Sequence, residues 1–176
     1  QALFCYYLKK GNYVIGGASN NGGNVFAWLK NLMGENIDYE QILANGEPGA
    51  GGLMFLPYLN GERAPFWDAG IEATFIGINS QHGQQEFIRA VMEGVMLHHT
   101  WMLEALEAQS SQVFERFYVS GGFTASTAWV QMLADMSEKE LLVGQSEEAS
   151  ARGAGRIGLE AIGKLDGEKQ RVEALQ

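Results

Sequence analysis

A glycine pair late in the sequence could bind a ligand through the protein backbone. Gly121-Gly122 follows a strand-like run at residues 117–119, and Ser126 stands near the start of the helix predicted next. Glycine leaves no side chain between backbone and ligand, and a helix N-terminus offers free N–H groups and a positive dipole end. A tight strand-to-helix turn explains the same residues, so both readings stay open.

A second glycine pair precedes the first predicted helix. Residues 20–23 read Asn-Asn-Gly-Gly, a turn whose asparagines could cap that helix.

The loop at 61–68 has an unusual composition, because it holds two aromatic residues, three charged residues and a proline. It either binds a ligand or is fixed against the core by a bridge between Arg63 and a carboxylate.

Other catalytic and metal-binding patterns are missing from the sequence. There is no P-loop pattern and no serine in a G-x-S-x-G turn. His82, His98 and His99 have no metal-ligand spacing, so we predict no metal site in the chain. His98 and His99 fall inside a predicted helix, where packing or solvation explains them better than catalysis.

Composition restricts the classes of function. The 176 residues carry a net charge of -9, which argues against a nucleic-acid surface but leaves a nucleotide ligand open. No apolar run approaches the ~20 residues of a membrane span. Cys5 is the single cysteine and lies in an apolar run, so we expect a buried thiol in a cytoplasmic protein.

The predicted elements mix strands and helices, which indicates the α/β class. A β-hairpin is expected over residues 2–17, and strands at 53–56, 74–78, 117–119 and 141–143. Helices are expected from about 23 to 32, 39 to 43, 86 to 107, 126 to 137 and 149 to 164, with a loop at 46–52. No linker divides the chain, and the residues after 165 form a charged tail.

Two of these segments together resemble a known family. Residues 73–78 and 86–93, seven residues apart, resemble the second signature of the FGGY carbohydrate kinases at every defined position. The segments at 16–23, 56–67 and 120–135 are most similar to gluconate kinases of that family. The resemblance covers residues 1–165, which it identifies as the nucleotide-binding C-terminal domain, followed by the tail at 166–176.

The resemblance implies an actin-like, ribonuclease H-like ATPase fold, a mixed sheet flanked by helices, with ATP and Mg²⁺ as cofactors. It implies that Gly122 and Ser126 contact the adenosine part of ATP. It also implies that Gly121, which has no side chain, allows the loop to approach the adenosine closely. It places Gly23 near the phosphates or ribose. The family's polar residue four positions beyond Gly23 is Ala27 in this sequence, which puts a side-chain contact there in doubt.

The implied reaction is transfer of the γ-phosphate of ATP to a hydroxyl of a sugar or sugar acid, gluconate first. Xylulose or glycerol-type kinases are the alternative. The family's catalytic Asp and a threonine-bearing phosphate loop belong upstream of this chain, as do most sugar contacts. We therefore assign no catalytic residue and expect the 176 residues alone to be inactive.

Two readings of another class remain, a non-catalytic nucleotide-binding module and a protein-interaction domain. Neither a nucleic acid nor a membrane is an expected partner, and a homodimer stays open.

Overall fold

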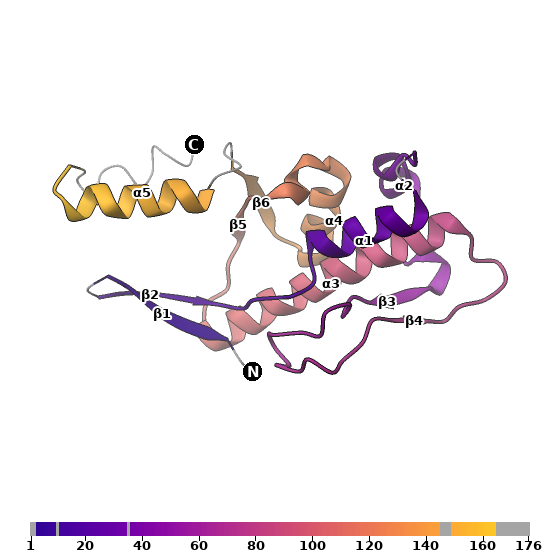
Figure 1. Cartoon of the computed structure of the whole chain (residues 1–176), viewed down its shortest axis with the longest axis horizontal. Helices are drawn as coiled ribbons and strands as arrows, with labels where there is room; N and C mark the ends of the chain where they lie inside the picture. The colour runs from indigo at the N-terminus through magenta and orange to yellow at the C-terminus, as the bar shows by residue number, and fades with distance from the viewer. Residues whose placement is uncertain (1–2, 10, 35, 145–148, 165–176) are drawn as a thin grey trace.

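The computed structural model describes residues 3–9, 11–34, 36–144 and 149–164 of the chain (Figure 1). In chain order its elements are β1 Phe4–Lys9, β2 Asn12–Gly16, α1 Gly23–Met33, α2 Tyr39–Asn45, the 3₁₀ turn η1 Ala50–Gly52, β3 Met54–Leu56, β4 Thr74–Ile76, α3 Gln84–Ser110, β5 Arg116–Val119, the 3₁₀ turn η2 Gly122–Ala125, α4 Thr127–Ser137, β6 Glu140–Val143 and α5 Ala149–Ala161.

The α/β class and each predicted helix and strand are confirmed, with ends shifted by a few residues. The loop expected at 46–52 includes η1, and η2 was not predicted at all. The charged tail predicted at 166–176 lies outside the described residues.

The strands pair in both the parallel and the antiparallel direction. In the described ranges they form three two-stranded sheets, of which β1–β2 and β3–β4 are antiparallel and β5–β6 is parallel. No helix in these ranges is long and apolar enough to span a membrane.

The long helix α3 organises the core (Figure 1). Helices α1, α2 and α4 pack on one side of it and β3 on another. The buried apolar side chains come from all of these elements and include Val25, Leu29, Leu43, Phe55, Ile88, Val91, Met92, Val95, Trp129 and Leu133. Burying such side chains is the main favourable contribution to folding.

Gly94 allows α3 to lie directly against β3. A Cβ at this position would come within 2.2 Å of the carbonyl oxygen of Phe55, so no larger residue fits without a backbone shift. One residue earlier, the buried Glu93 accepts a hydrogen bond from Arg89 at 2.7 Å and from the backbone N–H of Gly49 at 3.1 Å. Arg89 also donates to the carbonyl of Leu43 at 2.8 Å. These contacts tie α3 to the end of α2 and to the loop that follows it.

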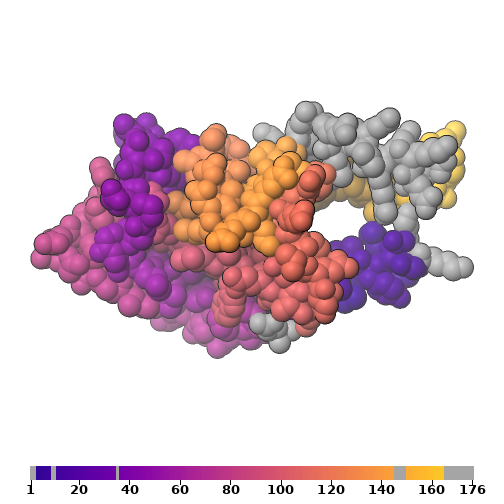
Figure 2. All heavy atoms as spheres, turned by 180° about the vertical axis from the view of Figure 1, so that it is seen from behind, coloured from indigo at the N-terminus to yellow at the C-terminus, as the bar shows by residue number. Residues whose placement is uncertain are grey.

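The hairpin β1–β2 stands out from the body of the molecule (Figure 2). Tyr6, Tyr7 and Tyr13 each expose more than 60% of their surface. Cys5 is exposed as well, so the prediction of a buried thiol is wrong. An apolar run identifies a strand, but it does not tell what covers that strand's faces.

Candidate nucleotide-binding site

The two glycine turns predicted to bind a ligand precede helices whose first turns pack against each other. Gly23 begins α1, whereas Gly121-Gly122 are separated from α4 by the 3₁₀ turn η2. Phe26 in the first turn of α1 contacts Trp129 in the first turn of α4, with ring centroids 5.5 Å apart. Phe123, which directly follows Gly122, packs on the same Trp129 at 6.0 Å. Since Trp129 is only 2% exposed, it fixes the N-termini of α1 and α4 as neighbours.

Gly121 and Gly122 present bare backbone to solvent. Gly121 has φ 106° and ψ 175°, a region that essentially only glycine adopts. A Cβ on either residue would meet nothing within 4 Å, so the space above both is open. The helix does not begin there, because η2 intervenes and Thr124 donates to the Gly121 carbonyl through both its N–H and its hydroxyl.

Ser126 is the N-cap of α4, and a carboxylate lies beside it. The Ser126 hydroxyl oxygen accepts the N–H of Trp129 at 3.1 Å and donates its own hydrogen to Glu40 at 2.5 Å. The other oxygen of Glu40 accepts the N–H of Ala128 at 2.7 Å. The start of α4 therefore already holds an anion, contributed by the first turn of α2.

The start of α1 has no such anion. Gly22 is its N-cap without a side-chain hydrogen bond, and the first turn contains no acidic residue. Gly23 is exposed, and a Cβ there would also meet nothing within 4 Å. The prediction that Asn20 or Asn21 caps this helix is wrong. Both side-chain amides donate instead to backbone carbonyls in the loop at 60–63. Asn20 donates to Asn60 at 3.1 Å, and Asn21 donates to Gly61 at 2.7 Å.

Glu62 anchors the segment before α1 from that loop. It is 2% exposed, and its two carboxylate oxygens accept hydrogen bonds from four donors. These are the Ser19 hydroxyl at 2.7 Å, the Asn20 N–H at 2.9 Å, the Asn21 side-chain amide at 3.1 Å and the Arg63 N–H at 2.7 Å.

The predicted bridge from Arg63 to a carboxylate is therefore not what fixes the loop. The guanidinium of Arg63 donates to the backbone carbonyl of Ser19 at 3.0 Å, and the adjacent Glu62 supplies the carboxylate. Burial alone would raise the pKa of Glu62, but the hydrogen bonds outweigh burial and hold it below its ordinary value.

His98 lies against the same carboxylate. It is 3% exposed, and its Nε2 is 3.0 Å from the Glu62 Oε2, although neither ring nitrogen makes a hydrogen bond to a described residue. Burial lowers the pKa of His98 despite the opposing effect of the Glu62 carboxylate, so the ring is neutral at pH 7. Of the two explanations expected for His98, packing or solvation, its burial shows packing.

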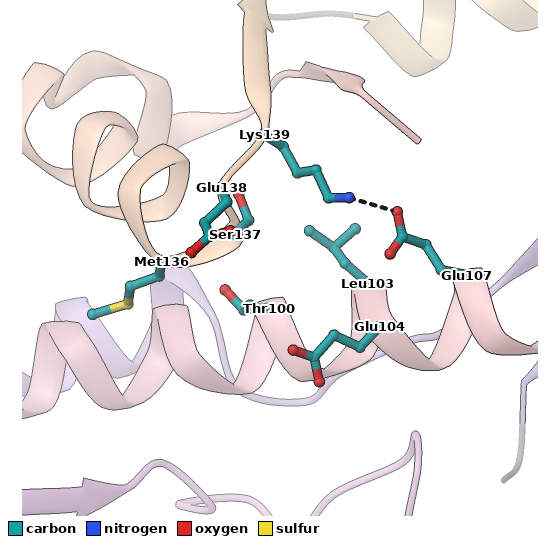
Figure 3. A pocket seen from close by; sticks show the side chains of 8 residues that line it. All are labelled: Thr100, Leu103, Glu104, Glu107, Met136, Ser137, Glu138 and Lys139. Atoms are coloured by element: carbon teal, nitrogen blue, oxygen red, sulfur yellow. Dashed lines mark hydrogen bonds and ion pairs between the residues drawn. The ribbon is translucent and has the colours of Figure 1, made fainter. Parts of the chain in front are cut away.

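A pocket of about 320 Å³ lies at the other end of α4, between that helix and α3 (Figure 3). An ion pair of 2.8 Å between Lys139 and Glu107 lies along its edge. Its lining residues are Thr100, Leu103, Glu104, Glu107, Met136, Ser137, Glu138 and Lys139. Three glutamates make it unsuited to phosphate, and none of the residues predicted for the site lines it.

The sequence matches the C-terminal domain of the FGGY family of carbohydrate kinases over residues 5–161. The chain belongs to this family. The FGGY domain is 39% identical over 178 residues to a gluconokinase of Bacillus licheniformis, in an alignment that covers 93% of this chain and 34% of that protein. It is 31% identical over 153 residues to a xylulose kinase of Lactococcus lactis subsp. lactis (strain IL1403), covering 85% of this chain and 30% of that one.

The fold of this FGGY domain matches the crystal structure of ligand-bound xylulose kinase from Lactobacillus acidophilus with a TM-score of 0.88 and 28% identity. The match covers 99% of this chain and 36% of that chain. The actin-like ATPase fold is thereby confirmed. The chain spans about a third of the length of each of these relatives.

The structure brings Gly23, Gly121, Gly122 and Ser126 of this FGGY domain to one neighbourhood, through the contact between Phe26 and Trp129. Sequence reasoning missed Glu40 and the anchoring role of Glu62. Glu40 is separated from Ser126 by 86 positions, and Glu62 from Ser19 by 43. No local pattern marks contacts over such separations.

Proposed function

We propose that this chain is the ATP-binding, C-terminal half of a kinase that phosphorylates a sugar or sugar acid. The observation that carries the proposal is the pair of open glycine turns, one at the start of α1 and one just before α4, whose neighbouring aromatic residues both pack on the buried Trp129. Three positions where an added Cβ would meet nothing provide bare backbone for a nucleotide, as a ligand held by backbone amides requires.

Charge supports one orientation of the nucleotide. The Glu40 carboxylate at the start of α4 repels phosphate, whereas the start of α1 has no acidic residue in its first turn. In the proposal the adenosine therefore lies on Gly121, Gly122 and Ser126, and the phosphates or ribose lie toward Gly23.

Ser126 fits an adenine in one further respect. A hydroxyl has one hydrogen to donate and two lone pairs. The hydrogen is given to Glu40 and one lone pair to the N–H of Trp129, which leaves one lone pair free. A free acceptor suits the 6-amino group of adenine and disfavours the 6-oxo group of guanine.

The proposed acceptor is the terminal hydroxyl of gluconate, giving 6-phosphogluconate. Its support is the higher identity to the gluconokinase, 39%, than to the xylulose kinase, 31%. A xylulose kinase is the second candidate, because the matched crystal structure bears that name. In either case we place most sugar contacts and the base that accepts the hydroxyl proton outside this chain.

Neither aspartate near these segments acts as the base in this proposal. Asp68 accepts the N–H of Gly70 at 2.7 Å and so holds its own turn. Asp135 accepts the amide of Gln131 at 2.7 Å on the surface of α4. The chain's own contribution is to bind and orient ATP for in-line transfer.

The described residues hold no group of three or more His, Cys, Asp or Glu side chains that could hold a metal ion without the nucleotide. Mg²⁺ therefore enters the proposal as the counter-ion that ATP brings, and no step relies on a metal held by this chain.

Calorimetric titration of the 176-residue chain with ATP·Mg²⁺ and GTP·Mg²⁺ tests the proposal. We expect weak binding of ATP, weaker binding of GTP and no phosphorylation of gluconate by this chain. Absence of any heat with ATP would instead support an interaction domain. Measurable turnover of gluconate by these 176 residues would contradict the assignment of the base to another part of the kinase.

A further inference from the structure

We infer that Glu62 is a positioning residue for the nucleotide turn at the start of α1. Its buried carboxylate ties residues 19–21 to the loop at 60–63 and thereby fixes where the backbone of Gly22 and Gly23 lies. The inference rests on the proposed function for the identity of the ligand at Gly23. The geometry of the turn can be tested without a ligand.

The contacts of Glu62 converge on the residues that immediately precede the turn. One carboxylate oxygen accepts the backbone N–H groups of Asn20 and Arg63, and the other accepts the Ser19 hydroxyl and the Asn21 amide. Asn21 is fully buried and donates also to the carbonyl of Gly61 at 2.7 Å. Three consecutive residues are thus held from one side chain, and the next two are Gly22 and Gly23.

The turn needs such support because its own residues provide little. Glycine loses more conformational freedom on ordering than any other residue, and α1 begins without a side-chain cap. Asn24 makes local side-chain bonds to the turn, because it accepts the Gly22 N–H and donates to the Asn20 carbonyl, each at 2.8 Å. A ligand held by backbone N–H groups requires those groups to be fixed beforehand.

A carboxylate is specifically suited to this position. It accepts four hydrogen bonds and donates none, which matches the four donors that face it. A glutamine would turn an N–H₂ group toward the Asn21 amide or the backbone N–H groups, so at least one buried donor would lose its acceptor. Among the described residues, one titratable side chain directly contacts this carboxylate. It is His98, whose Nε2 lies 3.0 Å from the Glu62 Oε2.

Glu93 offers a matched control. It is also a buried carboxylate, 6% exposed, and it also accepts a loop N–H, that of Gly49. It supports the loop after α2, which contains none of the residues proposed to contact ATP. Replacing either carboxylate by its amide removes a buried charge at equal side-chain size.

The experiment compares Glu62→Gln and Glu93→Gln in the 176-residue chain. ATP and ADP affinities are measured by calorimetry at a temperature where tryptophan fluorescence shows each variant to be folded. We expect Glu62→Gln to weaken binding by about tenfold, the effect of one lost charge-assisted hydrogen bond, and Glu93→Gln by less than about twofold. Equal weakening by both variants, or none by Glu62→Gln, overturns the inference.

A spectroscopic measurement separates positioning from general stability. In ¹⁵N-labelled protein without nucleotide, Glu62→Gln should shift the amide resonances of Gly22 and Gly23 and leave those of Gly121 and Gly122 in place. Unshifted Gly22 and Gly23 overturn the inference. If the parent chain binds no nucleotide, the proposed function fails, while this measurement still decides whether Glu62 sets the turn.

A second variant serves if Glu62→Gln does not fold. Ser19→Ala removes the hydroxyl that donates to Glu62 and accepts the N–H of Asn21 at 2.9 Å. We expect the same pattern of shifted resonances and a loss of affinity of about threefold, since this bond is one of four. An unchanged spectrum and an unchanged affinity overturn the inference.

Discussion

The starts of α1 and α4 look alike in sequence and differ in charge. Each combines a glycine pair with a helix, and each is exposed. At α1 the supporting carboxylate, Glu62, is buried behind the turn and leaves the helix N-terminus without a negative charge. At α4 the supporting carboxylate, Glu40, lies on the N-terminus itself. A glycine pair before a helix is therefore an anion site only where no side chain already supplies the anion.

The two helix starts also pack against each other, so a single ligand could contact both of them. Trp129 contacts Phe26 and Phe123, so a neutral group on one turn and a charged group on the other can belong to the same molecule. The contact of Trp129 with Phe26 joins the two helix starts.

Removing that contact should have the largest effect. Trp129→Ala deletes a side chain that is 2% exposed, and large-to-small changes of this kind cost ~3–5 kcal/mol. We expect a fall of this size in the free energy of unfolding by urea, with nucleotide binding lost at ambient temperature. Tyr6→Ala, at a position 63% exposed, is the control and should change stability by less than about 0.5 kcal/mol. Equal losses in both variants would show that Trp129 has no special role.

The two glycine turns should respond differently to alanine. Gly121→Ala forces a side chain into φ 106° and should destabilise the chain by ~1–3 kcal/mol. Gly23→Ala lies within a helix, where alanine is favoured by up to about 1 kcal/mol, so stability should hold or rise. Its methyl group enters the space assigned to the nucleotide, and we expect affinity for ATP to fall roughly tenfold. Unchanged affinity in Gly23→Ala would remove Gly23 from the site.

The sequence allowed both glycine turns to be found because turn chemistry is local. Gly121 and the helix after it follow from neighbouring residues, and so does the core face of α3 around Val91 and Val95. The roles of Glu40 and Glu62 could not be predicted, because their partners lie 86 and 43 positions away. Cys5 failed for a related reason: its strand was evident, but the exposure of both strand faces depends on what lies beside them.

Acid should destabilise the anchor behind α1. The pKa values of His98 and Glu62 are both lowered in the folded chain, so the unfolded chain binds protons more readily. The free energy of unfolding should therefore decrease as the pH is lowered. The decrease should begin below the ordinary His pKa of 6.5 and continue below the ordinary Glu pKa of 4.5. The slope for one proton is at most about 1.4 kcal/mol per pH unit.

Urea unfolding at a series of pH values measures this effect. His98→Gln should flatten the dependence just below pH 6.5, because it removes the group whose pKa is lower in the folded chain than in the unfolded chain. Glu62 and His99, the charged and titratable neighbours that affect the His98 pKa, remain in that variant. A slope as steep as in the parent chain would assign the acid sensitivity to other residues.

Glu40→Gln should have only a small effect on stability but the most direct effect on the contrast between the two turns. A single exposed charge at a helix N-terminus contributes ~0.3–1 kcal/mol, so the free energy of unfolding should fall by no more than that. Without its anion, the start of α4 should begin to attract phosphate, as we propose for the start of α1. Titration with inorganic phosphate, followed by the amide resonances of Ala128 and Gly23, measures both ends in one experiment. In the parent chain we expect Gly23 alone to respond, and in the variant both residues. If Ala128 responds equally in the two proteins, Glu40 does not decide which helix start accepts an anion, and the orientation proposed for ATP loses its electrostatic basis.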